Sequence, residues 1–338
     1  MSLSNGAAPA PLLTVDDLSV GFHSREGVLK AVSNVSFEIS PGEVLAVVGE
    51  SGSGKSVTAL ALMQLHPRNT EITGDVIFDG MDLLSMEDEE MRSIRGRDIA
   101  MIFQDPMTAM NPVFSVGDQI VESIVLHTDA NKKEAWSKAV DLLAAVGVPE
   151  PKRRASQYPH EYSGGMRQRA MIAMAIANDP KLLIADEPTT ALDVTVQAQV
   201  MEVLYDVQEQ TGSAMMLITH DLGLVAGAAD RVQVMYASRL METGNVDDVF
   251  YRSSNPYTRA LLDSIPDLET VKDSLSSIPG NPPSLAHPPP GCAFAPRCSM
   301  AVPDCGLAVP ELVPVVGEGH ASRCIRTADM GVAVEAPA

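Results

Sequence analysis

Eight residues near the start of the chain have the spacing of a phosphate-binding loop. The sequence GESGSGKS fits the pattern G-x-x-x-x-G-K-[ST], with an apolar run before it and a helix expected after it over Val57–Gln64. Glycines let the backbone turn its N–H groups towards phosphate oxygens, the lysine reaches the β- and γ-phosphates, and the last serine binds Mg²⁺. The pattern predicts a nucleoside triphosphate site. Its members are Gly49, Glu50, Ser51, Gly52, Ser53, Gly54, Lys55 and Ser56.

A pair of carboxylates follows a second apolar run. Leu182–Ala185 reads as a buried strand, and Asp186 and Glu187 come directly after it. Ligand chemistry in α/β sheets lies at the carboxyl ends of the strands. We therefore expect Asp186 to support Mg²⁺, directly or through water, and Glu187 to polarise the attacking water as a general base.

The elements that must position these residues are short strands alternating with helices. Such alternation favours an α/β domain with a mainly parallel sheet. A helix with apolar spacing is expected over Lys132–Val146, with Gly147 as its stop, inside a helical insert at about 105–175. The N-terminal strands are expected to form an antiparallel flank. The predicted strands are Leu12–Phe22, Val32–Ile39, Val44–Val48, Asp75–Phe78, Ile99–Phe103, Leu182–Ala185, Ala214–Thr219 and Val232–Tyr236.

A further run, Tyr162–Arg169 (YSGGMRQR), precedes the carboxylate pair, and most phosphate-loop ATPases have nothing like it. Here the sequence resembles the ABC ATPase family over roughly residues 12–270. The remaining family motifs fall in order, so the resemblance implies a P-loop ABC ATPase fold with a helical subdomain. They are Phe22 as the adenine-stacking aromatic, Gln104 as the Q-loop, Ala191-Leu192-Asp193 as the D-loop and His220 as the switch histidine.

The resemblance also implies roles for these residues. Gln104 contacts Mg²⁺ and the water, and its loop leads to the insert that meets a membrane partner. His220 contacts the γ-phosphate. Family members act as head-to-tail dimers, so the signature of this chain serves its partner's ATP through a serine hydroxyl, glycine N–H groups and a helix N-terminus. The signature departs from the pattern at Tyr162, where many members have Leu, with little effect expected. The signature residues are Ser163, Gly164, Gly165 and Gln168.

Four stretches are similar to one branch of the family, the oligopeptide and dipeptide importer ATPases. They are Phe103–Pro112, Tyr158–Glu161, Ala185–Gln199 and Ile278–Pro283. The branch implies ATP hydrolysis that powers peptide uptake, at the cytoplasmic face of the membrane. It also implies two membrane permeases, an extracytoplasmic binding protein and a second ATPase subunit, with a heterodimer favoured. An importer of another solute, such as nickel or a sugar, remains an alternative.

The C-terminal part holds all four cysteines. We expect a disordered lead-in over 1–11, the ATPase domain over 12–250, a helical segment over 251–278, and a Pro-rich linker with a cysteine-bearing region over 279–338. The cysteines in a reduced chain suggest metal ligation rather than disulfides. The importer branch carries a similar region, in which some members hold a [4Fe–4S] cluster; zinc and free thiols are alternatives. The cysteines are Cys292, Cys298, Cys305 and Cys324.

Composition narrows the function classes. The net charge of −20 disfavours a chain that binds nucleic acid through its phosphates. No apolar run is long enough for a membrane span, and the N-terminus lacks the features of a secretory leader. A soluble ABC ATPase acting on DNA or the ribosome is a further alternative. The spacing from Ser56 to Ser163 leaves no room for a long coiled coil, and there is only one ATPase cassette. A non-catalytic regulatory subunit is disfavoured because Glu187 and His220 are both present.

Overall fold

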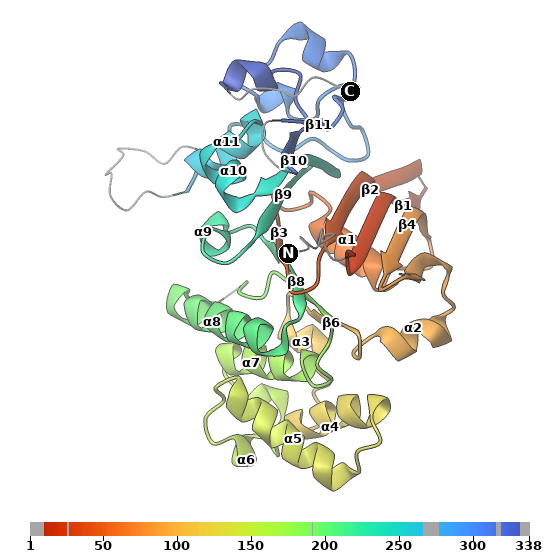
Figure 1. The fold of residues 1–338 in the computed structure, drawn as a ribbon, viewed down its shortest axis with the longest axis vertical. Helices are drawn as coiled ribbons and strands as arrows, with labels where there is room; N and C mark the ends of the chain where they lie inside the picture. Colours follow the sequence, from red (N-terminus) through yellow and green to blue (C-terminus); the bar gives the residue numbers. More distant parts are fainter. Residues whose placement is uncertain (1–9, 26, 191, 266–276, 316–318, 332–338) are drawn as a thin grey trace, which may run out of the picture. The chain divides into compact units, whose positions relative to one another are not determined.

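The computed structural model describes residues 10–25, 27–190, 192–265, 277–315 and 319–331. These residues belong to two compact units, which share the chain in alternating stretches (Figure 1). The first unit comprises Met1–Asp16, Ser36–Glu43 and Asp75–Met215, and the second comprises Asp17–Val35, Val44–Gly74 and Met216–Ala338. Most of the expected lead-in, part of the expected segment 251–278, the end of the cysteine-bearing region and Ala191 lie outside the described residues.

A four-stranded sheet is formed near the N-terminus, with the strand order β2-β1-β4-β5. The pair β4–β5 is antiparallel, with Phe78 opposite Met81. The three strands expected near the N-terminus correspond to β1, β2 and β4 of this sheet. Alternate residues are buried along the second half of β2, which is the pattern of a strand with one covered face. The bounds are β1 Leu13–Ser24, β2 Gly27–Ile39, β4 Thr70–Phe78 and β5 Met81–Asp82.

In the first unit, strands β6 (Ile99–Ile102) and β7 (Leu182–Asp186) pair in parallel, with Ile99 opposite Leu182. Every residue of both strands is buried, as the apolar runs predict. Helices account for much of the rest of this unit. They are α2 Asp88–Ile94, α3 Pro106–Ala109, α4 Val116–His127, α5 Lys132–Ala145, α6 Pro151–Arg154, α7 Gly164–Ala175 and α8 Val194–Thr211.

The expected helical insert is formed by α4, α5, α6 and α7, which pack on one another (Figure 1). Asn131 caps α5 by accepting from the backbone N–H groups of Lys133 and Glu134. The helix ends at Ala145, and Gly147 adopts a φ of +75° just beyond it. Helix α4 was not predicted, although Ser115 caps it and Asp118 lies in its first turn.

In the second unit, the strands follow the order β11-β12-β10-β9-β3. The pair β3–β9 is parallel, with Val48 opposite Val234, and the other three pairs are antiparallel. Strand β8 (Ala214–Thr219) runs from the first unit into the second. The bounds are β3 Val44–Val48, β9 Arg231–Tyr236, β10 Arg239–Asn245, β11 Val313–Pro314 and β12 Ala321–Ser322, with α1 Lys55–Leu62, α9 Leu222–Val225, α10 Val246–Tyr251 and α11 Pro256–Asp263. No helix in the described part of either unit has the length and apolarity that a bilayer crossing requires.

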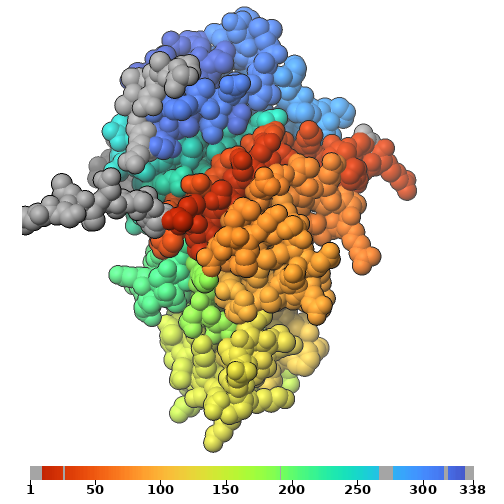
Figure 2. Space-filling model, turned by 45° about the vertical axis from the view of Figure 1, so that its right-hand side comes forward, coloured from red at the N-terminus to blue at the C-terminus, as the bar shows by residue number. Residues whose placement is uncertain are grey.

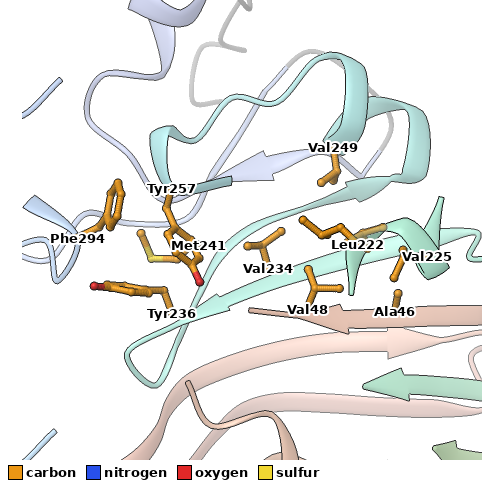
Figure 3. Packing of buried hydrophobic residues seen from close by; sticks show 11 residues of the cluster. Ala46, Val48, Leu222, Val225, Val234, Tyr236, Met241, Val249, Tyr257 and Phe294 are labelled. Atoms are coloured by element: carbon orange, nitrogen blue, oxygen red, sulfur yellow. The ribbon is translucent and has the colours of Figure 1, made fainter. Parts of the chain in front are cut away.

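The hydrophobic core of the second unit extends into the C-terminal segment (Figure 3). Phe294 is 3% exposed, and its ring lies 5.5 Å from that of Tyr236 and 5.1 Å from that of Tyr257. Aromatic pairs at these separations are favourable beyond the area that they bury. The described stretch Pro279–Pro290 has no helix or strand, as its prolines predict. The cysteine-bearing region, which has few large apolar residues, therefore packs on the core of the second unit and does not form a core of its own.

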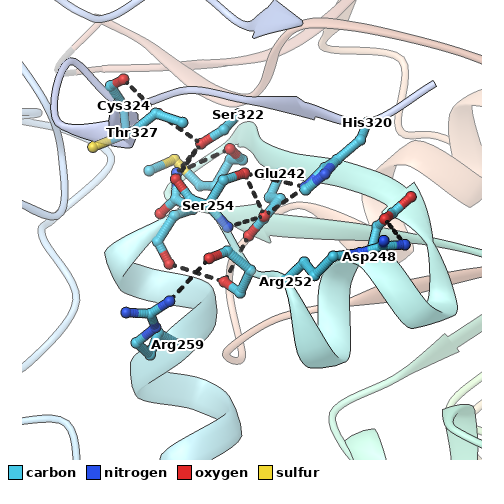
Figure 4. Close-up of polar contacts among 12 residues, drawn as sticks. Glu242, Asp248, Arg252, Ser254, Arg259, His320, Ser322, Cys324 and Thr327 are labelled. Carbon is cyan, nitrogen blue, oxygen red and sulfur yellow. Dashed lines mark hydrogen bonds and ion pairs between the residues drawn. The ribbon is translucent and has the colours of Figure 1, made fainter. Parts of the chain in front are cut away.

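A buried polar cluster holds the C-terminal segment to the same unit (Figure 4). Strand β12 pairs with β10, with Ser322 opposite Glu242. The Glu242 side chain is fully buried, and His320 Nε2 lies 2.9 Å from its Oε1. The Ser254 hydroxyl and backbone N–H also donate to Oε1, at 2.8 and 2.6 Å. Figure 2 shows the C-terminal residues (blue) lying directly against those of β10 to α11 (cyan).

Candidate active site

The phosphate loop lies in the second unit, between the buried strand β3 and helix α1. A Cβ atom at Gly49 would lie 2.1 Å from the carbonyl oxygen of Met235, and one at Gly54 would lie 2.4 Å from that of Ala31. Both glycines also have positive φ, of 147° and 108°. Only glycine can occupy these two positions, because the backbone passes so close to its neighbours.

The polar groups of this loop suit an anion. Lys55 is 4% exposed, and its ammonium donates to the carbonyl oxygens of Gly49 at 2.8 Å and Glu50 at 3.1 Å. The buried hydroxyl of Ser53 has no hydrogen-bond partner among the described residues. Ser56 lies in the first turn of α1, while Ser51 and Gly52 are exposed. A buried ammonium, an orphaned hydroxyl and a helix N-terminus together fit a phosphate group.

The carboxylate pair lies in the first unit, at the end of β7. Asp186 is 5% exposed, and Glu187 adopts a φ of +45°, a region that non-glycine residues rarely occupy. Gln104 Nε2 donates to Glu187 Oε2 at 2.8 Å, and the Thr190 hydroxyl donates to the same oxygen at 2.9 Å. The structure thus brings together two predicted residues, Gln104 and Glu187. Thr190 was missed, since a threonine after a strand carries no distinctive signal.

The signature residues also lie in the first unit, at the start of α7. Ser163 caps this helix by accepting from the Met166 N–H at 3.4 Å, and both Ser163 and Gly164 are exposed. A Cβ atom at Gly165 would lie 2.7 Å from Val196 of α8. Gln168 is only 2% exposed. The structure therefore leaves Ser163 and Gly164 accessible and buries Gln168 one turn along the helix.

The other predicted residues are spread over the two units. Asp193 is exposed and caps α8 through a 3.1 Å hydrogen bond from the Val196 N–H. His220 is exposed and directly follows β8. Phe22 is half-buried on β1. The phosphate loop, Phe22 and His220 belong to the second unit, whereas Gln104, Asp186, Glu187, the signature and Asp193 belong to the first.

All four cysteines line one small cavity in the second unit, together with Met300 and Arg326. The backbone N–H of Arg326 donates to Cys324 Sγ at 3.3 Å. Burial raises the pKa of the Cys324 thiol to about 11 and also raises those of Cys292 and Cys298. Over the residues that the structure describes, no group of three or more His, Cys, Asp or Glu side chains is arranged to hold a single metal ion.

Comparison with known families assigns two regions of the chain. The ABC transporter family matches residues 32–190, and the oligopeptide/dipeptide transporter C-terminal region matches residues 241–305. The second match covers β10 from Met241 onward, α11 and three of the four cysteines, Cys292, Cys298 and Cys305. The C-terminal segment is therefore a feature shared with transporters of that kind.

Individual relatives agree with this assignment. The chain is 52% identical over 280 residues to an oligopeptide transport ATP-binding protein of Bacillus subtilis, covering 82% of this chain and 78% of the relative. It is 50% identical over 322 residues to a probable peptide ABC transporter ATP-binding protein of Sinorhizobium fredii, covering 94% and 95%. A dipeptide transport ATP-binding protein of Lactococcus lactis is 50% identical, with 83% and 81% covered.

A solved structure of a dimeric ATP-binding cassette, bound to ADP and phosphate, is similar to this chain with a TM-score of 0.62. The two are 25% identical, and the match covers 69% of this chain and 98% of the cassette. The order of the motifs, the geometry of the phosphate loop and these relatives lead to one assignment. The chain belongs to the ABC transporter family, as an ATP-binding subunit of the oligopeptide and dipeptide transporter branch.

Proposed function

We propose that this chain hydrolyses ATP to power the import of peptides through partner permeases. The phosphate loop is the observation that supports ATP hydrolysis. In this loop Lys55 is buried, and the buried Ser53 hydroxyl has no hydrogen-bond partner among the described residues. The peptide cargo is supported by the relatives, which are oligopeptide and dipeptide transport ATP-binding proteins and are about half identical to this chain.

Each predicted site residue has its own role in ATP binding or hydrolysis. Backbone N–H groups of Gly49–Ser56 and the Lys55 ammonium bind the phosphates, while Phe22 stacks on adenine. Ser56, Gln104 and Asp186 would offer the oxygen ligands that Mg²⁺ prefers, and a bound ion would supply positive charge that offsets the charge of the phosphates. Glu187 accepts the proton of the attacking water, and His220 contacts the γ-phosphate. Gln104 and Thr190 fix the orientation of the Glu187 carboxylate.

The signature supplies the other half of a partner's ATP site. Ser163 and Gly164 are exposed at the start of a twelve-residue helix, so their polar groups can meet a phosphate of a second chain. The similar solved cassette is a dimer bound to ADP and phosphate. We infer a dimer with a second, related ATPase chain, in which Gly165 and Asp193 also lie near the shared nucleotide. The buried Gln168 then supports α7 from within.

Further partners follow from the importer branch. Two membrane permeases carry the peptide, an extracytoplasmic protein delivers it, and this chain works at the cytoplasmic face. ATP binding closes the ATPase dimer and hydrolysis reopens it, which drives the permeases between two states. The negative net charge of the chain is consistent with protein partners rather than nucleic acid.

The four cysteines are proposed to hold a [4Fe–4S] cluster. Their thiols line one cavity, and the backbone N–H of Arg326 donates to the sulfur of Cys324 at 3.3 Å. Such N–H···S hydrogen bonds stabilise thiolate ligands of clusters. The cluster would stabilise the fold of the cysteine-bearing region, which has few large apolar residues.

One experiment tests the central proposal. The chain is purified with its permeases, reconstituted in liposomes, and supplied with the binding protein and a labelled peptide. Peptide accumulation that requires ATP, and that Lys55→Ala abolishes, is the expected result. Arg92→Met, which alters an exposed ion pair, is the matched control and keeps uptake normal. ATP-dependent uptake of nickel but not of peptide would reassign the cargo, and nucleotide binding unaffected by Lys55→Ala would refute the proposed ATP site.

A further inference from the structure

An acidic residue of the phosphate loop is neutralised by an arginine from the cysteine-bearing segment. Arg297 Nη1 donates to Glu50 Oε2 at 2.6 Å, and Nη2 donates to Oε1 at 2.9 Å. The Arg297 side chain is 6% exposed and that of Glu50 is 24% exposed. This is a bidentate, charge-assisted ion pair with little access to water. Such arginine–carboxylate pairs are stronger than single hydrogen bonds between neutral groups. It raises the pKa of Arg297 further above its ordinary value.

Arg297 itself is held rigidly on the other side. Its Nε donates to the Pro279 carbonyl oxygen at 2.8 Å, and Nη1 also donates to the Tyr236 hydroxyl at 3.1 Å. The guanidinium lies 5.8 Å from the centre of the Tyr236 ring. Because these contacts come from β9 and the Pro-rich stretch, the guanidinium cannot follow the loop if the loop moves away.

The same loop residue is anchored through its backbone. The Glu50 N–H donates to the Tyr257 hydroxyl at 3.1 Å, and Tyr257 is fully buried against Tyr236 and Phe294. Glu50 is therefore fixed by its main chain and by its side chain. Both anchors come from residues beyond 235, outside the strand, loop and helix that form the motif.

The contacts of Glu50 with Arg297 and Tyr257 bear on ATP binding because of where Glu50 lies. Its carbonyl oxygen, with that of Gly49, receives the Lys55 ammonium. An unpaired carboxylate on a loop that binds phosphates would repel them, since like charges raise the energy of binding. Arg297 removes that repulsion by pairing with Glu50, and it also keeps the backbone that carries Lys55 in place.

We propose that Arg297 is a positioning residue for the ATP site: the cysteine-bearing segment reaches the phosphate loop through Arg297 and Glu50 and thereby sets the affinity for nucleotide. The inference rests on the proposed ATPase function. It gives the C-terminal segment a role in nucleotide binding in addition to its packing on the core.

Variants of the full-length chain separate this role from a merely structural one. Binding of Mg²⁺–ATP is measured by calorimetry for Arg297→Met, Glu50→Gln and the double variant, with Arg92→Met as the control. Arg297→Met should weaken binding by at least about tenfold, the effect of losing one charge-assisted contact. The double variant should regain most of that loss, because the unpaired carboxylate is gone. The ATP affinity of Arg297→Lys should lie between those of the wild type and Arg297→Met, since one charge-assisted hydrogen bond of the pair remains.

The outcomes are distinct. Equal ATP affinity of Arg297→Met and the wild type would overturn the inference, as would a double variant no better than Arg297→Met when both have native circular dichroism spectra. If Arg297→Met does not fold, Arg297→Lys decides, because it keeps a cation but loses one hydrogen bond of the bidentate pair. Its ATP affinity should lie below that of the wild type, and an affinity equal to that of the wild type would overturn the inference. Failure of the wild type to bind ATP at all would instead overturn the proposed function.

Discussion

Gln104 donates a 2.8 Å hydrogen bond to Oε2 of Glu187, and that same oxygen accepts from the Thr190 hydroxyl at 2.9 Å. Two donors on one oxygen hold the carboxylate plane in a single orientation. Glu187 is thus positioned by residues from two loops, one after β6 and the other after β7.

Replacing this carboxylate should separate binding from hydrolysis. Glu187→Gln keeps the shape of the side chain but loses the basic oxygen, so ATP binding is retained and the hydrolysis rate falls by about 100-fold or more. The rate is measured as phosphate release and the binding by calorimetry. Glu209→Gln, on the exposed face of α8, serves as the control and keeps full activity. A hydrolysis rate of Glu187→Gln close to that of the wild type would refute its role as the base.

The buried carboxylate of Glu242 gives a stability prediction. It accepts from Ser253 and Ser254, which directly precede the N-cap residue of α11, and from His320 near the C-terminus. Glu242→Ala removes the shared acceptor and leaves these polar groups without it in the interior, so the free energy of unfolding should fall by about 3–5 kcal/mol. Urea unfolding followed by circular dichroism measures the change.

The control for this substitution is Glu209→Ala, which truncates an exposed glutamate of the same size. Its unfolding free energy should lie within about 0.5 kcal/mol of the wild-type value. A Glu242→Ala variant as stable as Glu209→Ala would mean that the buried cluster of Glu242 and His320 contributes no net stability.

Tyr162 predicts a loss of stability at alkaline pH. Its hydroxyl donates to the Arg154 carbonyl oxygen at 2.9 Å, and burial raises its pKa from the ordinary 10.0 to about 12. A raised pKa in the folded state means that folding favours the protonated phenol. This contribution is complete below pH 10 and disappears as the pH rises towards about 12.

The comparison with Tyr162→Phe isolates this effect, since the other residues titrate alike in both proteins. The wild type should be more stable by about 1 kcal/mol near neutral pH, owing to its hydrogen bond. That advantage should shrink as the pH is raised through 10 and beyond. Urea unfolding at a series of pH values measures the difference, and a difference that does not vary with pH would contradict the assignment of the shift to Tyr162.

Much of the fold could be predicted because its strands are continuous apolar runs. Val44–Val48 and Ala214–Thr219 match β3 and β8 residue for residue, since glycine, serine or a polar residue bounds each run. The two-residue strands β11 and β12 could not be predicted, because they are shorter than any alternation pattern. Their place in the sheet depends on the pairing of β12 with β10 and of β11 with β12, which only the folded chain provides.

In the candidate site too, features formed by one short stretch of sequence could be predicted, and contacts between distant residues could not. The phosphate loop and the carboxylate pair are local patterns, and each is formed by one short stretch of chain. The pair of Glu50 and Arg297 joins residues 247 positions apart, and nothing in the spacing connects them. The burial of Glu242 could not be predicted either, because glutamate is rarely fully buried and the donors that satisfy it come from distant parts of the sequence. The roles of the individual site residues stay predictions.

The cysteine cavity leads to the last prediction. Protein purified without oxygen should absorb broadly at about 400 nm and contain about four iron atoms per chain, the properties of a [4Fe–4S] cluster. Cys298→Ser should lower the iron content and the melting temperature, because one ligand is lost and the segment beside Arg297 loosens. Ser299→Ala, at the exposed neighbouring position, is the matched control and should keep both values. Colourless protein that contains zinc would assign the cavity to zinc, and metal-free protein with four titratable thiols would assign it to free cysteines.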